Sequence, residues 1–243
     1  EVATDSSGRT PVIELKTPPL EYSMEPVEEQ PYAEYTIQVQ AEGFEKIGFS
    51  GGGGGSNPAC ERYGYGFVQG VEAGAAEKGT KVEMRYSWEY GSTFSASQDL
   101  QAMLSGWYEA GTEVVFMCGG SMFQSGTAAA GANDAYVIGV DVDQSGQSDT
   151  VITSAMKDLA GSTMDVIKGD YDGKWSDFGG KVTTFGAAED RVGIPTDTWK
   201  LENWTVEDYN ALYEKVKSGE IEISDELVSD PSTLEWENIS FIK

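Results

Sequence analysis

Asp141 and Lys157 are the two side chains in this sequence best suited to hold a polar ligand together. A carboxylate can accept both hydrogens of a vicinal diol, and an ammonium group can donate to the same hydroxyls while it neutralises the carboxylate. That combination suits a ribose. The alternative is a simple salt bridge between the two residues, which contributes little to stability when it is exposed.

The segment around these residues predicts how they are positioned. Residues 136–140 form a short apolar run with several β-branched side chains, which is typical of a strand buried on both faces of a parallel sheet. Asp141 and Asp143 follow that strand, where an open α/β sheet keeps its ligand crevice. We expect residues 153–154 to begin a helix with Lys157 in its first turn, where a cation opposes the helix dipole. A broken local preference of this kind often marks a functional site.

Two glycine-rich loops each join an expected strand to an expected helix. Residues 50–57 (SGGGGGSN) have the placement of a phosphate cradle, but they lack the Lys-Ser/Thr pair of a Walker loop and the acidic residue of a dinucleotide fold. We therefore interpret them as a flexible, tight connection at the crevice. In the second loop, the bare backbone amides of Gly119 and Gly120 can hold a ligand hydroxyl or a base oxygen. A tight turn between strand and helix is an equally good interpretation of that loop.

Four aromatic side chains gather near the end of the strand expected at residues 80–88, namely Tyr86, Trp88, Tyr90 and Phe94. An aromatic ring at the edge of a crevice can stack on a planar base. The alternative is packing between neighbouring elements of the fold.

The charge of the chain excludes several classes of partner. It carries 41 acidic and 16 basic residues, which gives a net charge of −25. Such a field repels phosphate backbones and anionic lipids, so we expect neither a nucleic acid polymer nor a lipid surface bound through protein charges. The sequence has no histidine, so it has no histidine-based catalytic triad, acid/base pair or metal site.

The two cysteines and the apolar runs say little about the cellular compartment. Cys60 and Cys118 lack the spacing of a metal site. A disulfide between them is conceivable, but two buried free thiols are the favoured interpretation. Because no apolar run is long enough to cross a membrane and no signal peptide is recognisable, we expect either a cytosolic protein or a mature form without its signal.

An alternation of strands and helices predicts an α/β fold with a parallel sheet covered by helices on both faces. The expected strands are residues 46–50, 80–88, 113–118 and 136–141, and the expected helices between them are residues 59–78, 95–111 and 121–133.

The two ends of the chain are less regular. Residues 1–30 resemble an irregular arm with one strand-like run at residues 11–15, and residues 28–42 fit either a helix or a strand. After the central segment we expect a helix over 154–170, with Met156, Leu159, Thr163 and Ile167 on one face, and two short strands within 181–194. A helix over 205–221 begins with a capping box from Thr205 to Asp208, and the acidic C-terminal residues are expected on the surface.

Several motifs together resemble the basic membrane protein family, the substrate-binding lipoproteins of ABC transporters that take up nucleosides, including purine nucleoside receptors. The motifs are IGFSGG followed by RYGYGFVQGVEAGA, then GSTFSASQDLQAMLSGWYEAGTEVVFMCGG, VIGVDVDQSGQSDTVITSAMKDL and TTFGAAEDRVGIPTDTW. The resemblance extends roughly from Glu28 to Ile223. The segment from Thr196 to Ile221 is most similar to versions from Gram-positive anaerobes.

The resemblance implies a type I periplasmic-binding fold, in which two doubly wound parallel-sheet lobes joined by three crossovers close on a ligand. Residues 1–45 and 146–188 would belong to the first lobe, and residues 46–145 and 189–243 to the second. Family members carry an opening segment before the part that matches Glu28, so the first lobe is expected to be incomplete.

The resemblance also implies ligand contacts and partners. Phe94 would stack on the base, the Gly119-Gly120 loop would line the site, and Asp141 and Lys157 would hold the ribose. No catalytic residue, metal or cofactor is expected. The partners would be a nucleoside, a purine nucleoside above all, and ABC permease subunits. The protein would lie on the extracellular face of the cell membrane, held there by a lipid anchor that is not part of this chain.

Three other functions stay open at the sequence level. The chain could be an extracellular sensor or interaction protein that kept the fold without transport, or a binding protein for another ribose-like or sugar ligand. A nucleoside hydrolase would need a metal-binding acidic cluster. Asp141 and Asp143 are too few for that, and alternate residues of a strand point to opposite faces.

Overall fold

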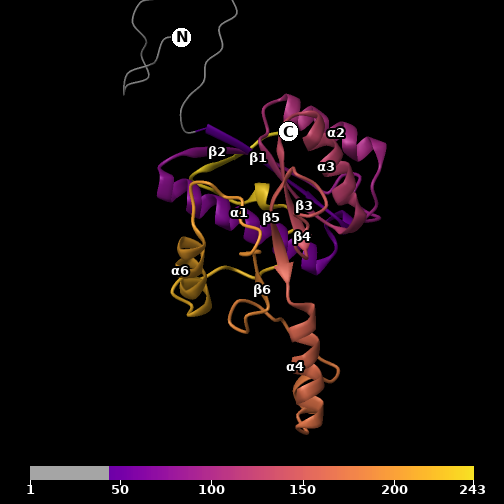
Figure 1. Ribbon diagram of the computed structural model, residues 1–243, viewed down its shortest axis with the longest axis vertical. Helices are drawn as coiled ribbons and strands as arrows, with labels where there is room; N and C mark the ends of the chain where they lie inside the picture. The colour runs from indigo at the N-terminus through magenta and orange to yellow at the C-terminus, as the bar shows by residue number, and fades with distance from the viewer. Residues whose placement is uncertain (1–43) are drawn as a thin grey trace, which may run out of the picture. The chain divides into compact units, whose positions relative to one another are not determined.

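Seven strands form one sheet in the structure, a computed structural model that describes residues 44–243 (Figure 1). The strand order is β6-β5-β4-β3-β1-β2-β7, and neighbouring strands are parallel except for β5 and β6. The strands are β1 (Phe44–Gly51), β2 (Lys81–Ser87), β3 (Val114–Cys118), β4 (Tyr136–Asp141), β5 (Val151–Lys157), β6 (Val192–Gly193) and β7 (Ile239–Phe241).

Helices connect the parallel strands from β1 to β4, which confirms the α/β fold predicted for this part of the chain. The α-helices are α1 (Pro58–Lys78), α2 (Gln98–Glu109), α3 (Phe123–Ala132), α4 (Leu159–Tyr171), α5 (Trp175–Phe178) and α6 (Val206–Lys217). Short 3-10 helices lie at η2 (Gly53–Gly55), η3 (Gly120–Met122) and η4 (Pro231–Thr233).

The two faces of the sheet carry separate apolar cores, as β3 shows most clearly. Val115 and Met117 pack in a core with residues of α2 and α3, whereas Phe116 and Cys118 pack in a core with residues of α1. This alternation follows from the period of two along a strand, and it places α1 on one face and α2 with α3 on the other. Figure 1 shows the same arrangement.

The helical spacing predicted for α1 and α2 is confirmed by burial. Leu100 and Leu104 of α2 are fully buried, and Val68 of α1 is fully buried as well. Each helix begins at a side-chain cap: Asn57 accepts hydrogen bonds from two amides of α1, and Ser97 accepts one from Leu100. These caps satisfy amides that lack a partner within the helix.

The predicted helix over 154–170 is wrong in its first part, because Val151–Lys157 is strand β5. Three consecutive β-branched residues begin this segment, and Val151 pairs with Val137 of β4 while its side chain is fully buried. Pairing with β4 therefore outweighs the helical spacing. Lys157 ends a strand and does not lie in the first turn of a helix, since α4 begins only after the cap residue Asp158.

The apolar face predicted for this helix is also wrong. Leu159 and Ile167 of α4 are exposed, and Gly169 is the only buried residue of that helix. Figure 1 shows α4 following β5 and pointing away from the sheet. The apolar contact of α4 is with α5, whose Phe178 ring lies against Gly169.

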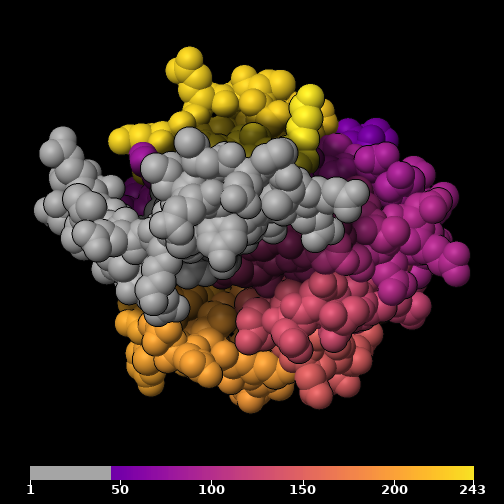
Figure 2. Space-filling model, turned by 90° about the horizontal axis from the view of Figure 1, so that it is seen from above, coloured from indigo at the N-terminus to yellow at the C-terminus, as the bar shows by residue number. Residues whose placement is uncertain are grey.

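The C-terminal third differs from the predictions in two further ways. Residues 181–194 contain one short strand, β6, where two were expected. The acidic C-terminal residues, yellow in Figure 2, do lie mostly at the surface, but β7 within them pairs with β2 and extends the sheet. Ile239 and Pro231 are buried there, so this segment contributes to the fold.

The capping box at the start of α6 is confirmed. The Thr205 side chain accepts a hydrogen bond from the Asp208 amide, and the Asp208 carboxylate accepts one from the Thr205 amide. We predict that Thr205→Ala lowers the free energy of unfolding by about 1 kcal/mol, the usual contribution of such a cap. Chemical denaturation followed by circular dichroism measures this change. Asn210→Ala, which removes an exposed side chain from the same helix without touching the cap, should cause no loss.

Some predictions lie outside the described residues, namely the arm at residues 1–30 with its strand-like run and the segment 28–42. The division into two lobes stays a prediction. Among residues 44–243, no helix combines the length and apolar character needed to cross a bilayer.

Candidate functional site

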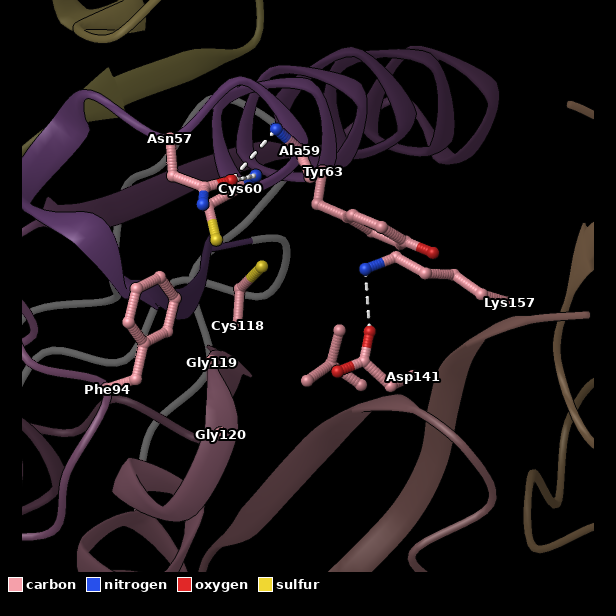
Figure 3. A pocket seen from close by; sticks show the side chains of 11 residues that line it. Asn57, Ala59, Cys60, Tyr63, Phe94, Cys118, Gly119, Gly120, Asp141 and Lys157 are labelled. Atoms are coloured by element: carbon pink, nitrogen blue, oxygen red, sulfur yellow. Dashed lines mark hydrogen bonds and ion pairs between the residues drawn. The ribbon is translucent and has the colours of Figure 1, made fainter. Parts of the chain in front are cut away.

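A cavity of about 290 Å³ lies where several of the parallel strands end (Figure 3). All five residues predicted to bind ligand line it: Phe94, Gly119, Gly120, Asp141 and Lys157. The remaining lining residues are Asn57, Ala59, Cys60, Tyr63, Cys118 and Val140. The carboxyl ends of parallel strands are the usual place for a ligand in an open α/β sheet.

Asp141 and Lys157 form an ion pair at one side of this cavity, with 2.6 Å between Lys157 Nζ and Asp141 Oδ1. They come together because β4 and β5 are adjacent parallel strands that both end here, with Asp141 opposite Met156. The side chains are 43% and 32% exposed. An ion pair this exposed contributes little to stability, so its groups are available to a ligand.

The backbone at Asp141 has an unusual conformation, with φ at 69°. A non-glycine residue in this left-handed region costs about 1–3 kcal/mol and persists only where its surroundings impose it. Two buried polar side chains do so. The Gln144 side chain accepts a hydrogen bond from the Val140 backbone amide through Oε1. The Gln144 backbone amide donates a hydrogen bond to Ser154 Oγ. These contacts hold the connection after β4 and thereby position the Asp141 carboxylate.

Tyr63 of α1 adds an aromatic face to the ion pair. Lys157 Nζ lies 4.9 Å from the centroid of the Tyr63 ring, a cation–π contact. The Tyr63 hydroxyl donates to the carbonyl oxygen of Met156 at 3.5 Å. Burial raises the pKa of the Tyr63 phenol well above its usual range, so the group stays neutral. Tyr63 was not among the residues predicted to bind ligand, because helical spacing alone does not tell which turn of α1 lies over the cavity.

Phe94 lies across the cavity from the ion pair (Figure 3). Its backbone is also in the left-handed region, with φ at 58°, and its carbonyl oxygen accepts hydrogen bonds from the Met122 amide and the Ser121 hydroxyl. These bonds tie the loop that carries Phe94 to the start of α3. The other aromatic residues of this group do not line the cavity.

The packing interpretation holds for those other rings. Tyr86 stacks on Phe49 at 4.5 Å between ring centroids, and Trp88 contacts Phe49 edge to face. Tyr90 is exposed to solvent. Only one of the four predicted aromatic candidates, Phe94, therefore faces the cavity.

The glycines of both loops make room for the Phe94 ring. A Cβ atom at Gly52 would lie 2.3 Å from Phe94 Cδ1, and one at Gly119 would lie 3.0 Å from the same atom. Gly120 has φ at 43°, and a Cβ there would lie 2.9 Å from the Phe94 carbonyl oxygen. The tight-turn interpretation of the second loop is thus supported, and the Gly119 amide already donates to Met117. The loop still lines the cavity.

Asp143 faces elsewhere. Its carboxylate accepts hydrogen bonds from the Ser145 amide and the Thr198 hydroxyl. Desolvation raises the pKa of this carboxyl, but the hydrogen bonds outweigh that effect and hold the pKa below its usual value. Asp143 lines a second hollow of about 540 Å³, which shares Asp141 and Lys157 with the first. The ion pair therefore borders both hollows.

Cys60 and Cys118 are both free and buried, as the sequence predicted. They lie in the wall of the cavity between Phe94 and the ion pair (Figure 3). Within residues 44–243, no three cysteine, aspartate or glutamate side chains lie close enough together to hold a metal ion.

Comparisons with known proteins relate this geometry to a family. The family model described as ABC transporter substrate-binding protein PnrA-like matches residues 42–226. Basic membrane protein B of Borreliella burgdorferi is 32% identical over 162 residues, which are 62% of this chain and 42% of that protein.

A solved structure shares the fold. An ABC transporter system solute-binding protein from Aeropyrum pernix K1 is 21% identical, with a TM-score of 0.57 over 78% of this chain and 59% of that one. This likeness confirms the predicted fold class and carries no argument about the ligand. The chain spans less than two thirds of the length of either relative.

Proposed function

This chain belongs to the PnrA-like family of ABC transporter substrate-binding proteins, and we propose that its cavity binds a nucleoside for uptake, a purine nucleoside above all. The observation that carries the proposal is that the Asp141–Lys157 ion pair and the Phe94 ring lie on opposite sides of one cavity. A nucleoside has the same two parts, a ribose diol and a planar base.

Each residue has a distinct role in this proposal. The Asp141 carboxylate accepts hydrogen bonds from the ribose hydroxyls, and Lys157 donates to them while balancing its charge. The Phe94 ring stacks on the base. The loop at Gly119 and Gly120 gives the flat wall that a base requires, because side chains there would collide with Phe94.

The size of the cavity fits a partial site. Its volume of about 290 Å³ is just below the range of roughly 300–1,000 Å³ that small-molecule sites occupy. The chain matches only part of the length of its relatives. We propose that residues 46–145 and 189–243 form one lobe, that residues 1–45 and 146–188 belong to the other, and that ligand contacts on both lobes drive their closure.

The partners follow from the family. In this proposal the protein acts outside the cytoplasm, on the extracellular face of the cell membrane, held by a lipid anchor. It releases its ligand to ABC permease subunits and performs no chemical step of its own. Lobe closure on the ligand is the signal that the permease senses.

Calorimetric titration tests the nucleoside assignment. Adenosine, guanosine, inosine, uridine and ribose are titrated separately into the full chain. Saturable binding of at least one nucleoside, tighter than that of ribose, is expected because only a nucleoside contacts both Phe94 and the ion pair. If all four nucleosides fail to bind, the assignment is wrong.

The negative charge of the chain predicts a preference for nucleosides over nucleotides. We expect adenosine monophosphate to bind about tenfold more weakly than adenosine at low salt, because a net charge of −25 repels the phosphate. Salt screens this repulsion, so the difference should narrow as ionic strength rises. Titrations of both ligands at low and high salt measure the effect. Equal affinity at low salt would contradict it.

A further inference from the structure

Cys60 and Cys118 are paired in space although 57 residues separate them in the sequence. Cys60 lies in the first turn of α1, and Cys118 is the last residue of β3. Both line the cavity, and their sulfur atoms point toward one another (Figure 3). Burial alone would make them two small apolar side chains, but a facing pair in the wall of an open cavity can also react.

The two thiols have different environments. The pKa of the Cys60 thiol is lowered by a hydrogen bond with Cys118 and by the positive charge of Lys157, which together outweigh the opposing effects of burial and of the Asp141 charge. The same hydrogen bond, together with burial, raises the pKa of the Cys118 thiol. Cys60 also lies at a helix N-terminus, which favours a thiolate. Cys60 is therefore suited to attack an oxidant, and Cys118 to resolve the product.

We propose that Cys60 and Cys118 form a redox-active dithiol, which closes to a disulfide in the wall of the cavity when it meets a small organic disulfide. The Cys60 thiolate attacks one sulfur of the reagent, whose S–S bond breaks and releases one thiolate that takes up a proton. Cys118 then loses its proton and attacks the Cys60 sulfur, and the second thiol leaves. The protein gives up two electrons and two protons, and the reagent is reduced to two thiols.

The bridge would have a defined effect on the cavity. It would tie the first turn of α1 to the end of β3, directly before Gly119. Tyr63 is one turn further along α1 and contacts Lys157, so the bridge would also restrain the wall beside the ion pair. A substrate-binding protein that acts outside the cytoplasm meets the oxidising conditions in which disulfides persist.

The test uses the reduced full chain and bis(2-hydroxyethyl) disulfide, a reagent small enough to enter the cavity. The reaction is carried out without denaturant, and its products are analysed by intact mass and by peptide mapping. The expected product has lost two hydrogen atoms and contains a linked peptide pair with Cys60 and Cys118. In Cys118→Ser the reaction should stop at a stable adduct on Cys60. In Cys60→Ser the remaining thiol should react far more slowly.

The proposal is overturned if the wild-type chain stays unmodified or keeps separate adducts on the two cysteines. The wild-type result decides this even if a variant fails to fold. The reaction is run without nucleoside and its product does not depend on nucleoside affinity, so failure of this inference and failure of the proposed function are distinguishable.

Discussion

Asp141→Ala is expected to weaken nucleoside binding by well over tenfold. The substitution removes both acceptors for the ribose diol and leaves the Lys157 ammonium without its partner at 2.6 Å. Hydrogen bonds to charged groups contribute about 1.5–3 kcal/mol each, so losing one of them already reaches a tenfold change. Calorimetric titration of the variant with inosine and with ribose measures the effect. Both ligands should lose affinity, since both carry the diol.

Asp143→Ala is the matched control for this variant. Asp143 is a carboxylate two residues away that bonds to Thr198 and Ser145 and does not line the 290 Å³ cavity. Its removal should leave nucleoside affinity within a factor of two or so, because no ligand contact is lost. If Asp141→Ala binds as tightly as Asp143→Ala, the Asp141–Lys157 pair is a salt bridge without a role in binding.

The fold between β1 and β4 could be predicted from sequence because each element there has a clear local signal. The strand at β4 is a continuous apolar run, and α2 repeats its buried leucines at helical spacing. The local signal is misleading at Val151–Lys157. The residues from Leu159 onward form a helix, so the helical spacing was extended back into a segment that is a strand. Only the pairing of this segment with β4, a contact distant in sequence, decides that it is a strand.

Asp141 and Lys157 were expected to lie together and they do, even though the element carrying Lys157 was predicted wrongly. The two residues were chosen for their chemistry, a carboxylate and an ammonium group that can share a ligand. That choice did not depend on whether Lys157 lies in a helix, as predicted, or at the end of strand β5, as observed. Tyr63 was missed because helical spacing does not tell which turn of α1 lies over the cavity. The need for a glycine at position 52 was missed for a related reason. A side chain there would collide with the Phe94 ring, and this close approach exists only in the folded chain.

The residues that hold the site in place, Gln144 and Ser154, could not be identified from the sequence either. Gln144 and Ser154 look like ordinary polar residues of a connection and a helix start. In the structure both are buried, and they bond to each other and to the end of β4. A buried polar side chain needs hydrogen-bond partners. The structural role of these two residues therefore becomes visible only when their burial is known.

Phe94→Ala should weaken the binding of a nucleoside and spare the binding of ribose. Stacking of a base on an aromatic side chain contributes about 1–3 kcal/mol, so inosine should lose roughly fivefold to a hundredfold in affinity. Ribose has no base and should bind the variant as it binds the wild type. Titration with both ligands separates this pattern from that of Asp141→Ala, which lowers both affinities.

Tyr90→Ala controls for the loss of an aromatic ring from the same loop. Tyr90 shares the left-handed backbone conformation of Phe94, with φ at 59°, but it is exposed and does not line the cavity. Its removal should leave both affinities unchanged. If Phe94→Ala lowers ribose and inosine affinity equally, the ring supports the loop at Gly119 and Gly120 and does not contact the base. The two variants therefore distinguish a stacking residue from one that only shapes the cavity.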